Sequence, residues 1–323
     1  MIMVRLMSML RKFFIPFLFC IVFLFAGCVS RPHFSAEDEA ARYPLAQYIP
    51  ESFDWSELCP GIYRCDFSNP DFPVIYHAVK IDLTLQGLEL VCFPDQSTVA
   101  EAGGKADGEV AQPFIYKGIR TQEFARLYDC EVAVNLSPFA GKTGKWDLPA
   151  KLGSVRQIVG LHVADGLMIS KPVSRYAALH FKREEGSEGK TGWRASIEKN
   201  QSDKAAAASD FAFGGFYVVL ENGNVEQVFL RNHDSRTGAG ISGDGRTLFL
   251  LVVEGENPAK SQGLSYPQCG EIFKAMGCSD ALEMDGGGSS ELCINGSSVL
   301  SYSNFRTQAN SLGFRINSQK DLK

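Results

Sequence analysis

The stretch with the clearest chemical potential is Ala281–Ser290, which reads Ala-Leu-Glu-Met-Asp-Gly-Gly-Gly-Ser-Ser. A short strand, Ala281–Met284, is predicted to end just before Asp285. Consecutive glycines let a backbone approach a ligand closely and can turn its N–H groups into an anion-binding concavity. We therefore expect a carboxylate beside a backbone nest and two hydroxyls, or else a glycine-rich bulge in which the aspartate forms a turn. The residues concerned are Asp285, Gly286, Gly287, Gly288, Ser289 and Ser290.

The surroundings of these glycines exclude two nucleotide-binding motifs. A Walker loop needs Gly-Lys-Ser/Thr at the start of a helix, and a dinucleotide fingerprint needs G-x-G-x-x-G between a strand and a helix. Here Glu291–Asn295 and Ser298–Tyr302 follow, and Asn295-Gly296 between them predicts a hairpin. The glycines therefore join one strand to another strand.

Three carboxylates are expected at or near strand ends. Glu254 follows Thr247–Val253, an apolar run typical of a strand buried on both faces. Glu283 and Asp285 are two residues apart, so they share one face of their strand. Paired carboxylates can divide acid and base work, because the charge of one raises the pKa of the other. The alternative for Glu254 is a solvated strand end.

Other polar residues also fall at strand ends. Asn135, after the predicted strand Glu131–Val134, could bind a sugar hydroxyl or form an Asx turn. Arg306 and Asn310 precede the last predicted strand, Leu312–Ile316, and are either anion and hydroxyl binders or surface residues.

The elements that must position these residues are mostly strands. Further strands are predicted at Val74–Asp82 and Leu88–Phe93, and at Arg236–Ser242, whose alternation is that of a half-buried strand. Hairpins are predicted through Asp165-Gly166 (Val155–Val163 with Leu167–Ser170) and Asn222-Gly223 (Phe211–Leu220 with Val225–Leu230). Gly214 and Gly215 mark a bulge or a close backbone approach.

Few helices are expected. Ser265–Met276 and Thr121–Tyr128 have helical patterns, the former with Ser265 as a possible cap, Pro267 in its first turn and Gly277 as a stop. Residues 182–210 are poor in large apolar side chains, which predicts a solvated surface insertion. We therefore predict one α+β domain over residues 51–323, with twisted mixed or antiparallel sheets flanked by a few helices.

The N-terminus predicts export. Basic residues precede an apolar run from Phe13 to Ala26, as in a secretory signal. Leu24–Cys28 resembles a bacterial lipoprotein box, in which Cys28 is lipidated. We expect residues 1–28 to be a lipoprotein signal peptide and residues 29–50 a tether, so that the protein is anchored to the membrane in the cell envelope.

The composition limits the kinds of binding partner and cofactor that are expected. A net charge of −5 without a basic cluster argues against nucleic acid. Seven cysteines follow Cys28, an odd number, with Cys59–Cys65 a candidate local pair. No C-x-x-C spacing occurs, so no structural zinc site is expected. The cofactor requirement stays open: no EF-hand spacing appears, but converging carboxylates suit a divalent cation such as calcium. His233, just before Arg236, is expected to be structural.

Taken in order, these motifs resemble the phosphodiester glycosidase family, whose namesake removes N-acetylglucosamine from a phosphodiester. The residues that carry the resemblance are Val134-Asn135 with Phe139, Gly214-Gly215, Arg236-Thr237 with Gly240-Ile241, Asp244–Thr247, Val252–Gly255, Ala281–Ser290, and Arg306 with Asn310. The sequence departs from the family pattern at three places. Glu254 stands where Asp is common, Glu283 where Asn is common, and Asn135 precedes Leu-Ser-Pro-Phe instead of Gly-Gly-Phe-Phe.

The resemblance implies hydrolysis of a sugar-1-phosphodiester to a sugar and a phosphomonoester. It implies catalytic roles among Asp285, Glu254 and Glu283, with Asp285 the essential carboxylate. Arg236 and the glycine amides would neutralise the phosphate, supported by Arg306. The remaining substrate-binding candidates are Asn135, Gly214, Gly215, Thr237, Ser289, Ser290 and Asn310. Two alternatives are a non-catalytic lipoprotein that binds envelope polysaccharide and a phosphatase acting on another phosphate ester.

Overall fold

The computed structural model describes residues 43–102, 110–141, 154–185, 191–228 and 231–317. The described residues from Leu45 onward form one compact unit. Cys28 and the predicted signal peptide lie outside the described residues. No helix among the residues described is long and apolar enough to cross a membrane.

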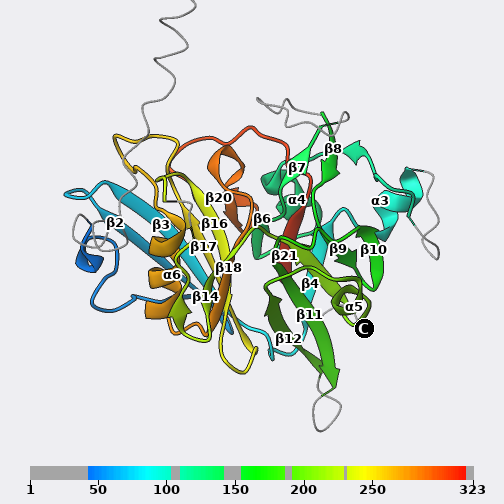
Figure 1. Cartoon of the computed structure of the whole chain (residues 1–323), viewed down its shortest axis with the longest axis horizontal. Coiled ribbons are helices and arrows are strands. Elements are labelled where there is room, and N and C mark those ends of the chain that lie inside the picture. The colour runs from blue at the N-terminus through cyan, green and yellow to red at the C-terminus, as the bar shows by residue number, and fades with distance from the viewer. Residues whose placement is uncertain (1–42, 103–109, 142–153, 186–190, 229–230, 318–323) are drawn as a thin grey trace, which may run out of the picture. The chain divides into compact units, whose positions relative to one another are not determined.

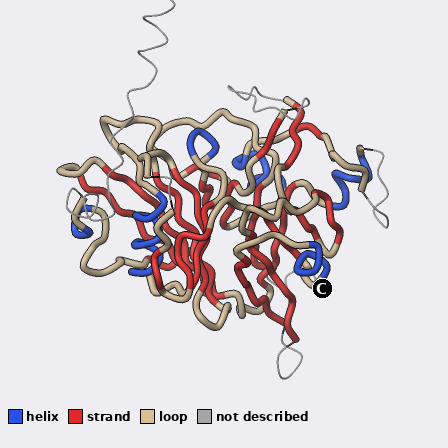
Figure 2. The backbone as a smooth tube through the Cα atoms, in the orientation of Figure 1, coloured by secondary structure: helices blue, strands red, loops and turns tan. Residues whose placement is uncertain are grey.

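Strands dominate the folded unit, and its helices are short (Figures 1 and 2). The α-helices are α3 (Gln96–Glu101), α4 (Thr121–Leu127), α5 (Asp203–Ala207) and α6 (Tyr266–Ala275), and the short 3₁₀ helices include η1 (Leu45–Gln47) and η3 (Gly287–Ser289). The strands are β1 (Ser56–Cys59), β2 (Ile62–Asn69), β3 (Val74–Asp82), β4 (Leu88–Phe93), β5 (Tyr116–Lys117), β6 (Val132–Asn135), β7 (Phe139–Ala140), β8 (Val155–Ile158), β9 (His162–Ala164), β10 (Leu167–Ser170), β11 (Ala178–Glu185), β12 (Thr191–Glu198), β13 (Phe211–Gly214), β14 (Val218–Glu221), β15 (Asn224–Val225), β16 (Arg236–Ile241), β17 (Thr247–Val253), β18 (Asp280–Glu283), β19 (Leu292–Ile294), β20 (Ser297–Ser298) and β21 (Ser311–Ile316). The predicted α+β class is confirmed, and the named strands pair antiparallel throughout.

The largest sheet has eight strands in the order β1-β2-β3-β17-β16-β18-β14-β15. Strand β17 lies between β3 and β16, which explains its unbroken apolar run and confirms the predicted central strand. Strand β16 is also buried along its whole length, so the expectation of a half-buried strand is wrong. Its small residues do not indicate exposure. They make room for helix α6, which packs on β14, β16 and β18.

Gly240 shows how closely α6 approaches β16. A Cβ atom at this position would lie 2.6 Å from Cδ1 of Phe273 and 2.7 Å from Sγ of Cys278. Real Cβ atoms essentially never come so near another heavy atom. The glycines of β16 therefore allow α6 to pack directly against the strand. This determines which face of the sheet α6 covers.

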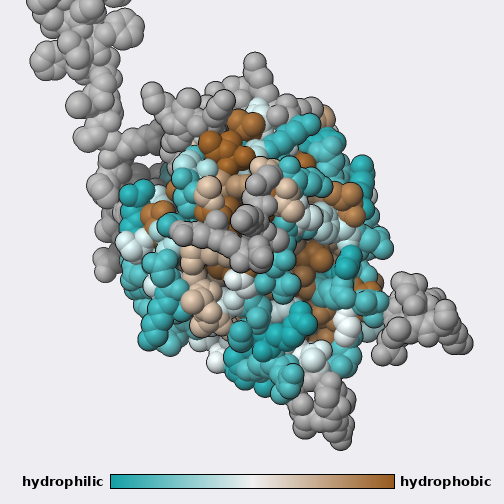
Figure 3. Space-filling view, turned by 90° about the vertical axis from the view of Figure 1, so that its right-hand side faces the viewer, coloured by the Kyte–Doolittle hydropathy of each residue, from teal (hydrophilic) through white to brown (hydrophobic). Residues whose placement is uncertain are grey.

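Two five-stranded sheets and one three-stranded sheet complete the unit, in the orders β10-β9-β13-β11-β12, β20-β19-β6-β21-β4 and β5-β8-β7. Figure 1 shows β3, β16 and β17 on its left and β9 to β12 on its right. The main core fills the space between the sheets, with Leu250 and Leu282 on one side and Phe181 and Leu312 on the other. Seen from the right-hand side of Figure 1, the surface is largely hydrophilic, with hydrophobic residues gathered in a few places (Figure 3).

Two predicted strands are broken where the chain changes sheets. The run 155–163 divides into β8 and β9, and the run 211–220 divides into β13 and β14. At the second break a Cβ atom on Gly215 would lie 2.5 Å from the carbonyl oxygen of Glu283. The expected close backbone approach at these glycines is therefore confirmed. The hairpins β9–β10, β14–β15 and β19–β20 form at the predicted turns.

The prediction of a solvated insertion over residues 182–210 is wrong for the part described. Strands β11 and β12 pair over their full lengths, and α5 follows them. Trp193 and Ala195 point into the core, whereas Arg194 between them pairs with Glu184. The polar residues that suggested an insertion belong to the outer face of this hairpin.

Two expectations near the N-terminus also change. The folded unit begins at Leu45, because Tyr48 is buried with its ring 6.4 Å from that of Phe72, so the predicted tether does not extend to residue 50. Cys59 and Cys65 are free thiols, as are the other cysteines among the described residues. The expected Cys59–Cys65 pair is therefore wrong.

Candidate active site

The turn at Asp285 lies where the eight-stranded sheet ends. Beyond β18, the N–H of Met284 donates to the Thr237 carbonyl oxygen over 2.8 Å. The N–H of Asp285 then donates to the carbonyl oxygen of Leu136 over 2.7 Å. Leu136 follows β6 of a different sheet. After the bond from Met284 to Thr237 on β16, the chain leaves the eight-stranded sheet at Asp285. It then crosses to the sheet that contains β6.

Asn135 holds this crossing in place. Its buried side-chain nitrogen donates to the Asp285 carbonyl oxygen over 2.7 Å. Its side-chain oxygen accepts from the Thr237 hydroxyl and from the Glu291 N–H, both at 2.9 Å. Both ends of the amide are therefore hydrogen-bonded to protein atoms. Asn135 and Thr237, two of the predicted substrate-binding residues, are placed to orient the Asp285 turn.

The Asp285 carboxyl faces Ser289 and Arg306. The Ser289 hydroxyl hydrogen-bonds this carboxyl and accepts a hydrogen bond from Nη1 of Arg306 over 3.1 Å. Burial raises the pKa of Asp285 to about 7, although Ser289 and the Arg306 guanidinium act to lower it. Asp285 is buried, with 8% of the residue exposed, and Gly286 to Gly288 beside it are half-buried. This is a carboxyl that can exchange a proton near neutral pH beside a fixed cation.

The glycine turn offers fewer free amides than the sequence suggested. The Gly287 N–H donates to the Ser235 carbonyl oxygen over 2.8 Å, and the Ser289 and Ser290 N–H groups close the η3 turn on Gly286 and Gly287. The half-buried Asp234 carboxylate also lies near, with its oxygens 3.8 and 3.9 Å from where a Gly287 Cβ would sit. An anion here therefore depends on a cation more than on a backbone nest.

Arg306 is the cation that covers the glycine turn. A Cβ atom on Gly288 would lie 2.8 Å from Nη2 of Arg306, so the guanidinium rests directly against this glycine. A side chain on Gly288 would displace the guanidinium from this position. The predicted group of Asp285, the glycines, Ser289 and Arg306 is thus brought together.

Arg236 and Glu283 form a separate buried group under α6. Glu283 is fully buried. Among the described residues, neither of its carboxyl oxygens has a conventional hydrogen-bond partner. The group that faces it is the thiol of Cys269, which is a weak donor. Burial raises the pKa of Glu283 to about 7 against the lowering effect of Arg236. The Arg236 guanidinium donates to the Leu264 and Asn232 carbonyl oxygens and stacks on Tyr266. Although the Arg236 backbone borders Gly286, its charge acts on Glu283, and Arg306 is the cation beside Asp285.

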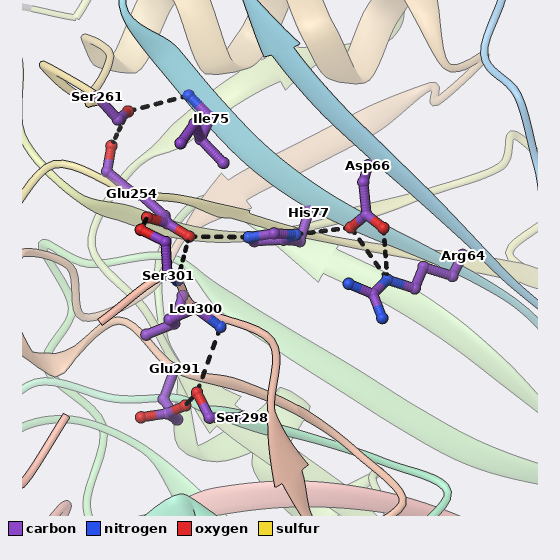
Figure 4. A network of polar contacts seen from close by, with 10 residues as sticks. All are labelled: Arg64, Asp66, Ile75, His77, Glu254, Ser261, Glu291, Ser298, Leu300 and Ser301. Carbon is purple, nitrogen blue, oxygen red and sulfur yellow. Dashed lines mark hydrogen bonds and ion pairs between the residues drawn. The ribbon is translucent and has the colours of Figure 1, made fainter. Parts of the chain in front are cut away.

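Glu254 belongs to a line of polar contacts shown in Figure 4. Nε2 of His77 lies 3.0 Å from Oε1 of Glu254, and Nδ1 lies 2.6 Å from Oδ1 of Asp66. Burial acts to raise the pKa of Glu254, but hydrogen bonds from His77 and Ser301 outweigh it and hold the pKa below its usual range. Glu254 is therefore an ionised, buried carboxylate whose oxygens are hydrogen-bonded to protein groups. It is not a solvated strand end.

The remaining predicted residues lie around the Asp285 turn. Asn310 is buried, with both ends of its amide bound to Ser137 at 2.8 Å. Ser290 is fully buried, and its hydroxyl has no partner among the described residues. Gly214 lies at the sheet change, where a Cβ would meet the Leu161 nitrogen at 2.8 Å. The Asn310 and Ser290 side chains are buried, and so is Gly214.

Sequence reasoning missed His77, Asp66 and Ser301. His77 and Asp66 face each other in the β2–β3 register, which could have been suspected only if β2 had been predicted. Ser301 carries no local signal, because its partner Glu254 is 47 residues away.

A cavity of about 830 Å³ lies elsewhere, between β4 and the β11–β12 hairpin, with Arg183, Trp193 and Arg315 in its wall. It includes none of the predicted site residues. Within the described ranges, no three His, Cys, Asp or Glu side chains are grouped to hold a metal ion.

Solved structures share the fold at low sequence identity. A hypothetical protein from Synechocystis matches with a TM-score of 0.56 and 12% identity over 82% of this chain, which spans 64% of that protein. The catalytic domain of zebrafish N-acetylglucosamine-1-phosphodiester alpha-N-acetylglucosaminidase, auto-inhibited by its pro-peptide, matches with a TM-score of 0.52 and 17% identity, over 79% of this chain and 82% of that domain. A Burkholderia pseudomallei protein matches with a TM-score of 0.52 and 14% identity over 75% of this chain and 74% of its own.

Comparison with curated proteins finds no match to the sequence. The sequence model of the phosphodiester glycosidases matches residues 128–315, a range that contains β6, β16, β18 and the whole Asp285 turn. Because this match covers more than half of the chain, the protein belongs to the phosphodiester glycosidase family.

Proposed function

We propose that this protein hydrolyses a sugar-1-phosphodiester, of the N-acetylglucosamine-1-phosphodiester kind, and releases a free sugar and a phosphomonoester. Family membership supports hydrolysis of this bond type. The observation that carries the proposal is the joining of Asp285 to Arg306 through the Ser289 hydroxyl. This places a carboxyl that titrates near neutral pH next to a cation suited to a phosphate oxygen.

The chemistry follows from these two side chains. Arg306 would bind the bridging phosphodiester and stabilise the negative charge that gathers on the phosphate as it leaves. Asp285, with a pKa of about 7, would supply the acid/base or nucleophilic function at the sugar carbon. A phosphate is already a good leaving group, so one essential carboxylate is enough for the main step.

The other two carboxylates support the site without touching substrate. Glu283 is enclosed beneath α6, and Glu254 is bonded to His77 and Ser301. We therefore assign the larger catalytic effect to Asp285 and smaller effects to Glu254 and Glu283.

The proposed location is the cell envelope, with a lipid anchor on Cys28, and a glycan phosphodiester as substrate. Its support is the apolar run and lipoprotein box in the first 28 residues. Labelling cells with a radioactive fatty acid tests it. The wild type should incorporate label and Cys28→Ser should not, and equal labelling of the two would contradict the anchor.

Asp285→Asn should lower turnover of an N-acetylglucosamine-1-phosphodiester by about 10² to 10⁴, because the amide keeps the shape but cannot transfer a proton. Free sugar and inorganic phosphate are measured separately, with and without a chelator. Asp280→Asn, at the start of the same strand, is the matched control and should keep wild-type turnover.

Full turnover by Asp285→Asn would refute the catalytic assignment. Release of inorganic phosphate by the wild type would favour the phosphatase alternative. Binding of an envelope polysaccharide with no product would favour the binding lipoprotein.

Glu283→Gln should lower turnover much less than Asp285→Asn does, and it should change how stability depends on pH. Burial raises the pKa of Glu283 to about 7 from 4.5, so the protonated form is favoured in the folded state. Its stabilisation is complete below about pH 4.5 and is lost as pH rises through 7, by on the order of 3 kcal/mol. Urea unfolding of wild type and variant across pH 4 to 9 isolates this group, since Asp285 and Glu291 titrate alike in both. Parallel stability curves would show that Glu283 does not titrate as described.

A further inference from the structure

The guanidinium of Arg306 is carried by the segment Ser298–Arg306, which leaves β20 at Ser298. Beyond this strand the segment has no sheet partner among the described residues, apart from the backbone bond between Val299 N–H and the Leu292 carbonyl oxygen. Val299 and Leu300 also pack against the main core, and the rest of the segment is attached by side-chain hydrogen bonds. Arg306 lies between this attached segment and Gln308, which bridges to Ile119, so the attachments before Arg306 help to keep the guanidinium against Gly288.

Two buried carboxylates hold the start of the segment. The Ser298 hydroxyl is hydrogen-bonded to Oε1 of Glu291. The Ser301 N–H donates to Oε1 of Glu254 over 2.8 Å, and the Ser301 hydroxyl is hydrogen-bonded to Oε2 of the same carboxylate. Figure 4 shows both attachments, with Leu300 between them. Further along, the side-chain nitrogen of Asn304 donates to the Ser290 carbonyl oxygen over 3.0 Å, and Asn304 Oδ1 accepts from the Arg306 N–H.

Glu254 is held in place in turn by a hydrogen bond to His77. The imidazole bridges Oε1 of Glu254 and Oδ1 of Asp66, and Asp66 in turn pairs with Arg64 at 2.8 Å. Glu254 and His77 are almost fully buried, whereas the Asp66 side chain is 48% exposed. The line therefore runs from solvent at Asp66 to the segment at Ser301.

We propose that His77 and Glu254 are positioning residues, which act through Ser301 to hold Arg306 over the glycine turn. This inference deepens the proposed function and rests on it, because Arg306 is the phosphate-binding side chain of that site. The two residues touch neither substrate nor the reacting atoms. They set how well the cation is placed, so they govern substrate binding more than the chemical step.

The charges around the line give the proposal a pH dependence. His77 faces the carboxylates of Asp66 on β2 and Glu254 after β17, with Arg64 behind Asp66. Burial acts to lower the pKa of His77, but its bonds to these two carboxylates raise the pKa above the usual value. The protonated ring can donate to both carboxylates, and this is lost as pH rises through the raised pKa. Glu291, whose pKa burial raises to about 7, titrates at the other attachment and becomes charged as pH rises.

The variants are His77→Gln and Ser301→Ala, with Ser301→Thr as the conservative rescue. The matched control for His77→Gln is His180→Gln, because His180 on β11 is also a buried histidine and is hydrogen-bonded to Ser209. The matched control for Ser301→Ala is Ser242→Ala, because Ser242 is hydrogen-bonded to Asp244 in a turn at the opposite end of β16. The first readout is hydrogen exchange of the peptide covering residues 298–306. The second is KM and kcat for the phosphodiester between pH 6 and 9.

His77→Gln and Ser301→Ala should speed exchange in 298–306 and raise KM by roughly tenfold with kcat little changed, as expected for loss of a charge-assisted hydrogen bond. Ser301→Thr and both controls should match the wild type. Wild-type KM should rise toward the His77→Gln value at high pH. This comparison removes the contributions of Asp285 and Glu291, which are common to both proteins.

Unchanged exchange in His77→Gln, or faster exchange with an unchanged KM, would overturn the inference. An equal effect in His180→Gln would do the same, since it would indicate general loosening. If the wild type hydrolyses no sugar-1-phosphodiester, the proposed function fails, and the exchange data alone then decide whether His77 anchors the segment.

Discussion

The side-chain amide of Asn135 joins two sheets at the point where the chain turns away from β18. It accepts from Thr237 on β16 and from the Glu291 N–H, and it donates to the backbone of Asp285. Because all three bonds are buried, leaving any of these groups unpaired would cost about 1 to 3 kcal/mol. The Asp285 carboxyl is thereby fixed at the seam between sheets, where burial and a nearby cation can both act on it. The rest of the site is arranged around this turn.

Three carboxylates that look alike in the sequence acquire different electrostatic states from their surroundings. Asp285 is buried beside Arg306 and has a pKa of about 7, and the half-buried glycines follow it. Glu283 has a similar pKa but is enclosed beneath α6. Glu254 is kept ionised by His77 and Ser301. Only Asp285 combines a pKa near 7 with a place beside the half-buried glycine turn, which is why one carboxylate is assigned the main chemical role.

Local signals in the sequence predicted much of this fold, and distant contacts could not be predicted. The hairpin turns at Asp165, Asn222 and Asn295 were identified because each requires a positive φ, which these residues adopt. The division of residues 211–220 between two sheets was missed, because a single apolar run contributes a strand to each sheet.

The β11–β12 hairpin was missed because its outward-facing polar residues masked the pattern of the inward-facing Trp193 and Ala195. At the site, the loop containing Asp285 was identified from its run of glycines after a predicted strand and from the family resemblance. The His77–Glu254 contact joins residues 177 positions apart, so no spacing rule reveals it.

The central claim is that Asp285 is a reactive carboxyl whose protonation is set by burial and by Arg306. The most direct test is the pH profile of kcat/KM on an N-acetylglucosamine-1-phosphodiester, which reports the pKa values of the free enzyme. The wild type should show an inflection close to pH 7, Arg306→Lys should keep it there, and Arg306→Gln should move it upward because the lowering charge is gone. An inflection near the ordinary aspartate value of about 4, or one that Arg306→Gln leaves in place, would contradict the account.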